Sequence, residues 1–370
     1  VVDYSVSGTA TSGSDFTALS GQVTILAGAT TATIVVPTLD DVQVEGFETV
    51  RVTLDAISSG DPSVTLGGAT TATVAIADND AASWALAGSA SVSEGASASY
   101  TVSLAGAFES GEDASVDLSL TDVDTSSADY ADFSAAVSAA VGSYAGPGSY
   151  AWDGTTLTFT ADADNQVAGD LIIALGATDD GTVESDEDFT ISLASPGSTT
   201  GAAVNLGGTS SVTTTITDND LATVSIAQTA DGDETGPASG LFTVSLSSPS
   251  TSDTVVDYSV SGTATSGSDF TALAGQVTIL AGATTATIVV PTLDDVQVEG
   301  FETVRVTLDA ISSGDPSVTL GGATTATVAI ADNDAASWAL TGSASVSEGA
   351  SASYTVSPVS YTHLRAHETY

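Results

Sequence analysis

The sequence has 370 residues, of which 3 are basic and 47 are acidic, so that its formal net charge is −44. A chain this acidic is repelled by nucleic acid and by anionic membrane surfaces, and it attracts cations. Hydrophobic residues make up 42% of the chain, enough to form a folded core, and the lack of cysteine excludes disulfides and thiol chemistry. Methionine is absent even at position 1, so we interpret the sequence as an internal fragment. No apolar run is long enough to span a membrane.

A long stretch of the sequence occurs twice. Residues 1–103 return as residues 255–357, and the copies differ at only two positions. Such near-identity indicates either a recent duplication or homogenisation of the gene-conversion kind, within a tandem array. A shorter period is marked by the motif DND, which ends at Asp80, Asp220 and Asp334.

The DND motifs divide the chain into repeats. Almost no linker separates each motif from the strand-like run that follows, so we expect neighbouring repeats to stack closely. Residues 1–80 form a first repeat that lacks its N-terminal strands, 81–220 and 221–334 are complete second and third repeats, 335–358 begin a truncated fourth repeat, and 359–370 form a tail.

Apolar residues alternate with polar ones along most of each repeat. In ETVRVTLDA, for example, Val304, Val306 and Leu308 alternate with threonine and arginine. This period of two is typical of half-buried strands, and clusters of Ser, Gly and Asp separate the runs. The pattern predicts an all-β chain of tandem antiparallel sandwiches with no helix.

The carboxylates gather in four short stretches of each repeat. In the third repeat these are DGDETG, SGSDF, LDDVQVEGFE and ADND, at the ends of predicted strands. A solvated acidic surface of the halophilic kind would instead place acids on the outward faces of strands, where this chain has Thr and Ser. The grouping therefore favours sites at which several carboxylates meet.

Calcium suits such a group of carboxylates. Crowded carboxylates repel one another, and Ca²⁺ takes 6–8 oxygen ligands in a flexible geometry that loops can supply. Mg²⁺ prefers strict octahedral geometry, and Zn²⁺ would require His or Cys, which the repeats lack. The same lack excludes Ser-His-Asp and Cys-His catalysis, and paired carboxylates that recur in every repeat indicate an ion site. We therefore expect no enzyme activity.

The motifs GSD(F/Y), DDxxVEGxE and DND, in this order, resemble the Calx-beta repeat over residues 1–357. The resemblance implies a seven-stranded immunoglobulin-like sandwich that binds Ca²⁺ at one end, as in the regulatory loop of sodium–calcium exchangers. Bacterial members occur as long arrays in large secreted or surface proteins. The resemblance further implies the following ligands: Asp15, Asp40, Asp41, Glu45, Asp78 and Asp80; Glu94, Asp129, Asp179, Asp180, Glu184, Asp218 and Asp220; and Glu234, Asp269, Asp294, Asp295, Glu299, Asp332 and Asp334.

Some assignments are weaker. Glu48, Glu187 and Glu302 are candidates for a supporting role, and Glu348 is the one candidate in the fourth repeat. Asp231 and Asp233 are alternatives to Glu234 as the ligand from this stretch, because all three lie in DGDETG.

The second repeat carries an insertion at about residues 131–152. A tolerated Ala/Gly/Ser surface loop is one interpretation. The other is a loop that contacts a ligand through Tyr144, Tyr150 and Trp152.

The tail differs in composition from the repeats. The sequence VSYTHLRAHETY begins where the fourth repeat should continue as LAGAF, and it contains His363, Arg365 and His367. We interpret residues 359–370 as translated sequencing-adapter read-through. A His-x-x-x-His metal site is the alternative.

Together these features predict a calcium-stiffened stalk or spacer in a large bacterial extracellular protein, of adhesin type. Its partners would be neighbouring repeats and an unknown surface or matrix ligand. The alternatives are a recognition module that binds glycan or protein through residues 131–152, and a non-catalytic spacer beside an enzyme domain outside this fragment.

Overall fold

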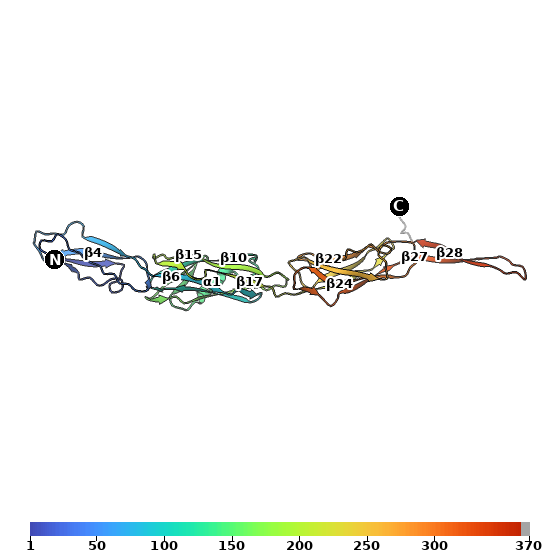
Figure 1. Ribbon diagram of the computed structural model, residues 1–370, viewed down its shortest axis with the longest axis horizontal. Helices are drawn as coiled ribbons and strands as arrows, with labels where there is room; N and C mark the ends of the chain where they lie inside the picture. The colour runs from blue at the N-terminus through green and yellow to red at the C-terminus, as the bar shows by residue number, and fades with distance from the viewer. Residues whose placement is uncertain (364–370) are drawn as a thin grey trace. The chain divides into compact units, whose positions relative to one another are not determined.

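The computed structural model describes residues 1–363, with side chains described through Pro358 (Figure 1). The chain divides into two compact units. Unit 1 contains Val1–Asp179 and Glu187–Thr217, and unit 2 contains Asp180–Asp186 and the described residues from Asp218 onward. The predicted all-β tandem architecture is confirmed, with one helix in the described part of the chain. No helix among these residues is long and apolar enough to cross a membrane.

The third repeat, in unit 2, is a sandwich of two sheets. One sheet has the order β23-β20-β18-β25 and the other β19-β26-β24-β21-β22. The strands are β18 (Ala222–Ala230), β19 (Gly232–Asp233), β20 (Gly240–Leu246), β21 (Thr254–Gly262), β22 (Gln276–Ile279), β23 (Thr285–Val290), β24 (Glu302–Ser313), β25 (Val318–Leu320) and β26 (Thr325–Ala331).

The alternating pattern explains why this sandwich forms. Val304, Val306 and Leu308 of β24 are buried, whereas the residues between them face outward or are partly exposed. Phe242 and Val244 of β20 belong to the same core from the opposite sheet. Burial of these apolar side chains between the sheets is the main force that holds the repeat together.

The second repeat, in unit 1, is also a sandwich. Its sheets have the orders β11-β12-β10-β15-β17-β7 and β14-β8-β6-β16, and Trp84, Tyr100 and Phe159 are buried between them. The strands are β6 (Ala81–Gly88), β7 (Ser91–Ser93), β8 (Ser97–Ala105), β10 (Asp113–Asp122), β11 (Ser149–Trp152), β12 (Thr156–Thr160), β14 (Leu171–Gly176), β15 (Glu187–Gly197), β16 (Ala203–Leu206) and β17 (Ser211–Thr217).

The expectation that the chain contains no helix is wrong. The insertion of the second repeat folds into α1 (Phe133–Ser143), labelled in Figure 1 beside the strands of its repeat. The side chain of Asp132 caps the helix by accepting a hydrogen bond of 2.7 Å from Ala135 N. Val137 and Ala140 are buried, and the run between cap and end is rich in the helix former alanine.

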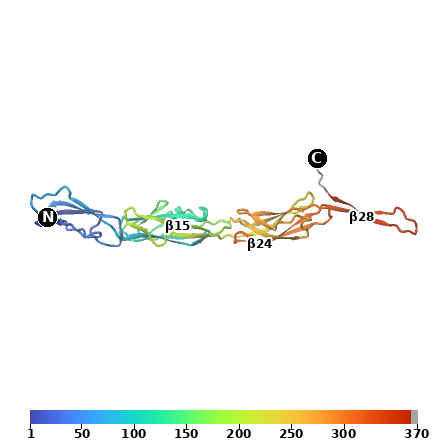
Figure 2. The same cartoon turned by 45° about the horizontal axis from the view of Figure 1, so that its top comes forward.

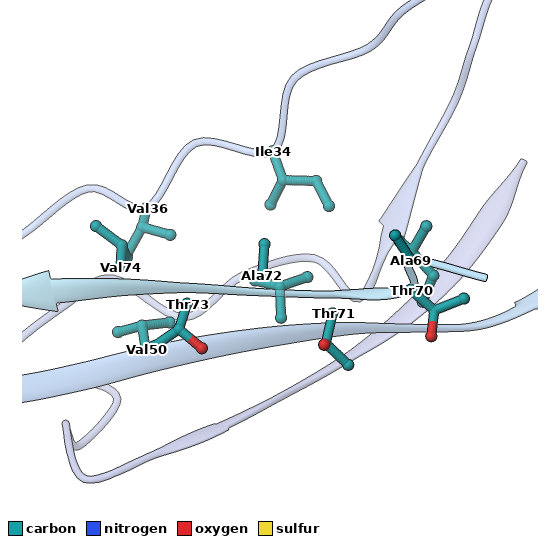
Figure 3. Close-up of a pocket in the computed structure, with 11 residues that line it drawn as sticks. Ile34, Val36, Val50, Ala69, Thr70, Thr71, Ala72, Thr73 and Val74 are labelled. Atoms are coloured by element: carbon teal, nitrogen blue, oxygen red, sulfur yellow. The ribbon is translucent and has the colours of Figure 1, made fainter. Parts of the chain in front are cut away.

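The main sheet of the first repeat, in unit 1, has the order β2-β1-β4-β5. A groove of about 460 Å³ lies against it, with Ile34 and Val36 on one side and Val74 on β5 opposite (Figure 3). In the third repeat the equivalent residues Ile288 and Val290 are covered in a core that includes Phe242. The strands are β1 (Val2–Gly8), β2 (Gln22–Val23), β4 (Glu48–Ile57) and β5 (Thr71–Ile76).

Two small assemblies complete the fold. Within unit 1, β3 (Gln43–Val44) of the first repeat joins β9 (Ala107–Phe108) and β13 (Gln166–Val167) of the second in the order β13-β9-β3. Within unit 2, β27 (Asp334–Gly342) and β28 (Tyr354–His363) pair as an antiparallel hairpin, visible in Figures 1 and 2.

Candidate metal centre

In the third repeat, the loop SGSDF places one carboxylate at the end of the sandwich. Phe270 is buried, so it anchors the loop to the core, and Gly267 adopts a φ of +95° that favours glycine. Asp269, between these two residues, is also buried and accepts a hydrogen bond of 2.5 Å from Thr265 N. Its position is therefore fixed by the turn and by the neighbouring aromatic anchor.

The loop before β24 is shaped by Asp295. Its carboxylate accepts hydrogen bonds from Gln297 N at 2.7 Å and from Gln297 Nε2 at 3.0 Å. An aspartate that bonds to the backbone two residues ahead forms an Asx turn. The turn brings Glu299 back towards the end of the sandwich.

The motif ADND joins these loops. Asp332 Oδ1 accepts from Asp334 N at 2.8 Å, and Asp332 Oδ2 accepts from Glu299 N at 2.7 Å. Asn333 Nδ2 donates to Asp294 Oδ1 at 3.0 Å. A single short motif therefore links the end of β26 to the loop before β24.

The third-repeat candidates come together in two groups of carboxylates. In each group, one oxygen of every member lies within 4.8 Å of the others. The first group is Asp269, Asp295 and Glu299, and the second is Glu234, Asp332 and Asp334. Asp294 is tied to the second group through Asn333, and Glu302 forms a hydrogen bond with Asp269 of the first.

Of the three acidic residues in DGDETG, Glu234 is the one that lies in a carboxylate group. Its side chain is only 3% exposed, and its Oε2 is buried without a hydrogen-bond partner. Asp231 Oδ1 instead accepts from Ala329 N at 2.7 Å, and Asp233 Oδ1 accepts from Thr235 N at 2.7 Å. Both aspartates therefore stabilise local backbone.

Crowding changes the acidity of these side chains. Burial, followed by the charges of Asp332 and Asp295, raises the pKa of Glu234 to about 7. The hydrogen bond with Asp269, and then burial, raises the pKa of Glu302 to about 7. No basic side chain is among the charges that shift either pKa. Near neutral pH these groups therefore hold protons that a cation would displace.

The first repeat has one such group. Asp15, Glu45 and Glu48 each place an oxygen within 4.8 Å of the others, and Asp78 Oδ2 accepts from Glu45 N at 2.8 Å. Asp80 N donates to Asp78 Oδ1 at 3.0 Å. A cavity of about 40 Å³ is lined by Asp15, Asp40, Asp41, Glu45, Glu48, Asp78 and Asn79, among others. This volume is enough for one small ion or water.

Glu109 is an acidic neighbour of this site that the sequence did not indicate. It belongs to the second repeat, directly after β9, yet its charge contributes to the raised pKa of Glu45, which is about 7, and of Glu48, which is about 8. Burial is the largest cause of both shifts. The pKa of Glu109 itself is raised by burial and then by the charge of Asp15. Because Glu109 approaches through pairing between β9 and β3, no motif within one repeat could have revealed it.

A sequence profile of the Calx-beta domain matches residues 1–80, 109–220 and 223–334. The chain belongs to the Calx-beta family. The comparison with curated proteins gives no match.

Among solved structures, the chain is similar to the apo form of the Calx CBD1 domain, with 22% identity, 30% of this chain and 98% of that chain covered, and a TM-score of 0.27. It is also similar to CBD12 from CALX1.2, with 16% identity over 67% of this chain and 98% of that chain, and a TM-score of 0.26. A third structure, the calcium binding domain CBD12 of CALX1.1, shows 15% identity over 65% of this chain and 96% of that chain, and a TM-score of 0.25.

The second Calx-beta repeat divides its candidates between the two units. In unit 1, Asp129 accepts from Ser126 N at 2.5 Å, and Asp179 lies against Gly95, next to Glu94. Glu187 begins β15 in the same unit. In unit 2, Asp218 Oδ2 accepts from Glu184 N at 3.0 Å, Asp218 Oδ1 accepts from Asp220 N at 2.9 Å, and Asp180 Oδ1 accepts from Thr182 N at 2.6 Å. The link between the DND motif and the acidic loop therefore recurs in all three Calx-beta repeats.

The remaining candidates lie outside these groups. Glu348 is exposed between β27 and β28. His363 ends β28, and Arg365 and His367 lie outside the described residues.

The aromatic residues of the insertion have packing roles. Tyr150 is buried and donates to Gly169 O at 3.0 Å, while Tyr144 contacts its ring edge-on with centroids 4.7 Å apart. Trp152 Nε1 donates to Ser134 Oγ of α1 at 2.9 Å. These side chains attach the helix to the second Calx-beta repeat.

The donor set of these carboxylate groups fits a hard divalent cation. It consists of carboxylate oxygens, and in the third repeat the buried Oδ1 of Asn333, which has no hydrogen-bond partner, lies in the same motif. Oxygen ligands without nitrogen or sulfur, held on loops, match the preference of Ca²⁺. The only basic residues of positions 1–358, Arg51 and Arg305, are exposed on β4 and β24.

Proposed function

We propose that each Calx-beta repeat binds Ca²⁺ at its acidic end and that this region is a calcium-stiffened stalk or spacer. The parent would be a large bacterial protein, secreted or displayed at the cell surface, that takes part in adhesion. The role is structural and not catalytic, and the partners of each repeat are its neighbours in the chain. An adhesive ligand elsewhere would bind to other parts of the parent protein.

The buried carboxylate of Glu234 is the observation that carries calcium binding. Its Oε2 is removed from water without a hydrogen bond, and the nearest charges are those of other carboxylates. The carboxylate has one backbone hydrogen bond, with Asn333, but burying an ionised carboxylate with only part of its hydrogen bonds made is unfavourable, and two unit charges 4 Å apart repel by about 4 kcal/mol at an effective dielectric constant of 20. A dication among Glu234, Asp332 and Asp334 would relieve both penalties.

Calcium would stiffen the region by holding the loops at each acidic end. Asp332 already links the loop before β24 to the end of β26, and an ion would add bonds to the same carboxylates. Extracellular calcium sites often have dissociation constants of about 10⁻⁴–10⁻³ M. Such sites are filled outside cells and empty in the cytosol, so the region would stiffen after export.

Thermal unfolding of the whole chain tests calcium binding. Melting is measured in calcium, in magnesium and in excess chelator at fixed ionic strength, and bound calcium is counted by equilibrium dialysis. A ligand that binds only the folded state adds about 2.7 kcal/mol at a hundredfold excess over Kd. We expect a rise specific to calcium, and equal melting in all three conditions would contradict the proposal.

A matched pair of variants places the ion. Glu234→Gln should lower the number of calcium ions bound to the third repeat. Glu348→Gln makes the same change at an exposed position outside both groups and should bind as many ions as the parent chain. Equal loss in the two variants would show that calcium binds the acidic surface without a defined site.

We also propose that residues 359–370 are translated adapter sequence. Genomic reads that continue after the fourth repeat as LAGAF would support this origin, because the copy at Ser103 continues in that way. A native transcript that encodes VSYTHLRAHETY would contradict it. Residues 364–370 lie outside the described part of the chain.

A further inference from the structure

Two segments of identical sequence differ in exposure. Gln43–Gly46 in the first repeat and Gln297–Gly300 in the third both read QVEG. Val44 is 1% exposed, whereas Val298 is 44% exposed. Because the surrounding sequences are also the same, the difference comes from what packs against each segment.

In unit 1, the second repeat covers Val44. β3 pairs in parallel with β9, so that Val44 lies opposite Phe108, and Val44 belongs to the hydrophobic core of the second repeat. Gln43 Oε1 accepts a hydrogen bond of 2.8 Å from Asn165 N. The joint therefore combines strand pairing, apolar burial and a side-chain hydrogen bond.

Glycine permits the close approach of the two repeats. A Cβ on Gly46 would lie 2.3 Å from Thr200 O of the second repeat, whereas a Cβ on Gly300 would meet nothing within 4 Å. On the opposite side, a Cβ on Gly106 would lie 3.2 Å from Val44 Cγ2. The sequence of the third-repeat segment thus contains a glycine that only a docked neighbour requires.

The same joint occurs once more, within unit 2. Val183 takes the place of Val44 in DDGTV, three residues after the second aspartate, and it is fully buried in the core of the third repeat. It forms a parallel bridge to Ser250, accepts from Thr251 N at 3.0 Å, and donates from its own N to Pro249 O at 2.9 Å. Two segments of different sequence therefore use a valine at the same position as a docking residue.

We propose that Gln297–Gly300 is a docking surface for the sandwich of another Calx-beta repeat, with Val298 inserted into the core of that repeat. The two acceptor segments among the described residues, Ala107–Phe108 and Pro249–Ser250, are already paired with Val44 and Val183. A second copy of this chain therefore offers no vacant acceptor, and an additional repeat does. The inference concerns how repeats are joined, so it goes beyond calcium binding and stands whether or not the ion is bound.

An extended chain tests the docking. Residues 335–357 match 81–103 with one substitution, so adding the sequence of residues 104–220 directly after Ser357 completes a fourth repeat in register. The chain has no cysteine, and a single cysteine can therefore report exposure through its rate of reaction with a thiol reagent. Val298→Cys should react rapidly in the 370-residue chain and about tenfold or more slowly in the extended chain, in calcium.

Two further cysteine variants calibrate the reaction. Val44→Cys should be protected in both chains, because its neighbour is present in both. Phe301→Cys should react rapidly in both, because Phe301 is 82% exposed and its counterpart Phe47 remains 70% exposed beside a docked segment. Adding Gly300→Ala to Val298→Cys should restore rapid reaction in the extended chain and change nothing in the shorter one.

The inference is overturned if Val298→Cys reacts equally fast in both chains while Val44→Cys is protected. It is also overturned if Gly300→Ala leaves the protection intact. Protection of Val298→Cys that persists in chelator still supports docking, whereas the melting experiment in calcium tests ion binding separately. The docking proposal and the calcium-binding proposal can therefore be contradicted independently of each other.

Discussion

The backbone amide of Glu299 donates a hydrogen bond of 2.7 Å to Asp332 Oδ2, and this bond ties the acidic loop to the DND motif. The equivalent bonds are those from Glu45 N to Asp78 at 2.8 Å and from Glu184 N to Asp218 at 3.0 Å. In each repeat, one aspartate therefore holds two backbone segments and also presents its charge to the candidate ion site. Loss of this residue should affect loop order and ion binding together.

Replacing Asp332 should remove the response of the third repeat to calcium. In Asp332→Ala, the backbone amides of Glu299 and Asp334 both lose their hydrogen-bond acceptor. Each amide that stays buried without an acceptor lowers the free energy of unfolding by about 1–3 kcal/mol. The number of bound calcium ions and the calcium-dependent rise in melting temperature should both fall. Asp309→Ala, at an exposed position on β24, is the control and should retain both. An unchanged ion count in Asp332→Ala would exclude this aspartate from the site.

The calcium-free chain should become less stable as pH rises towards neutrality. The pKa values of Glu45 and Glu234 are raised from 4.5 to about 7, so the folded state holds protons that the unfolded state has released. A raised folded-state pKa gives stability that is present at low pH and lost as pH rises through the folded value. Melting temperature in chelator should therefore fall between about pH 4.5 and pH 7, the unfolded-state and folded-state pKa values of these groups. Saturating calcium should flatten or reverse this slope, and a slope that is identical with and without calcium would contradict the assignment.

Removing the charge of Glu109 should act on the first repeat, although the residue belongs to the second. In Glu109→Gln, the pKa values of Glu45 and Glu48 should move down towards their ordinary range, because one nearby negative charge is lost. Carboxyl resonances followed by NMR during a pH titration of the calcium-free chain would measure the shift. Glu348→Gln should leave these pKa values unchanged.

Val44 and Val298 form a natural matched pair for stability. Val44→Ala should destabilise the joint in unit 1 by about 1–2 kcal/mol, since it removes two buried methyl groups. Val298→Ala makes the same change at an exposed position and should stay within about 0.5 kcal/mol of the parent chain. Hydrogen exchange of the amides around β3 and β9 would report the loss locally. Equal effects of the two substitutions would contradict the difference in their burial.

The cap of α1 should matter to the second repeat alone. Asp132→Ala removes the acceptor for Ala135 N and should cost about 1 kcal/mol, whereas Asp132→Asn should retain most of the stability. Unfolding that is followed through tryptophan fluorescence would detect the change, because two of the three tryptophans, Trp84 and Trp152, lie in this repeat and Trp152 is bonded to the helix through Ser134. Equal melting of the alanine and asparagine variants would contradict the capping role.

Local sequence patterns were sufficient for most of the strands. Alternation along ETVRVTLDA predicted the buried face of β24. The ligand assignments drawn from SGSDF, DDVQVEG and DND stay predictions, and in the third repeat carboxylates from these motifs lie in two groups that do not include Asp294. The helix was not predicted because both interpretations of the alanine-rich insertion treat it as a loop. Asp132, followed by Phe133, Ala136 and Val137 at helical spacing, was the signal that could have identified it.

The joints between repeats could not be predicted from these patterns. Val44 and Val298 have the same neighbours in sequence, and only the pairing of β3 with β9 distinguishes them. Glu109 reaches the first repeat through that same pairing. Contacts of this kind depend on the register of strands from different repeats, which a pattern within one repeat does not contain.

The near-identity of residues 1–103 and 255–357 has a consequence for folding. Neighbouring domains of the same sequence tend to exchange strands while they fold, because each can complete the other's sheets. In this chain the first and third repeats are separated by a second repeat that differs in sequence and carries a helix. A strand exchanged between the identical copies would have to close a loop around the whole intervening repeat, which lowers its chance of forming. Placing an unlike repeat between the two copies therefore lets the chain keep duplicated sequence while limiting misassembly during folding.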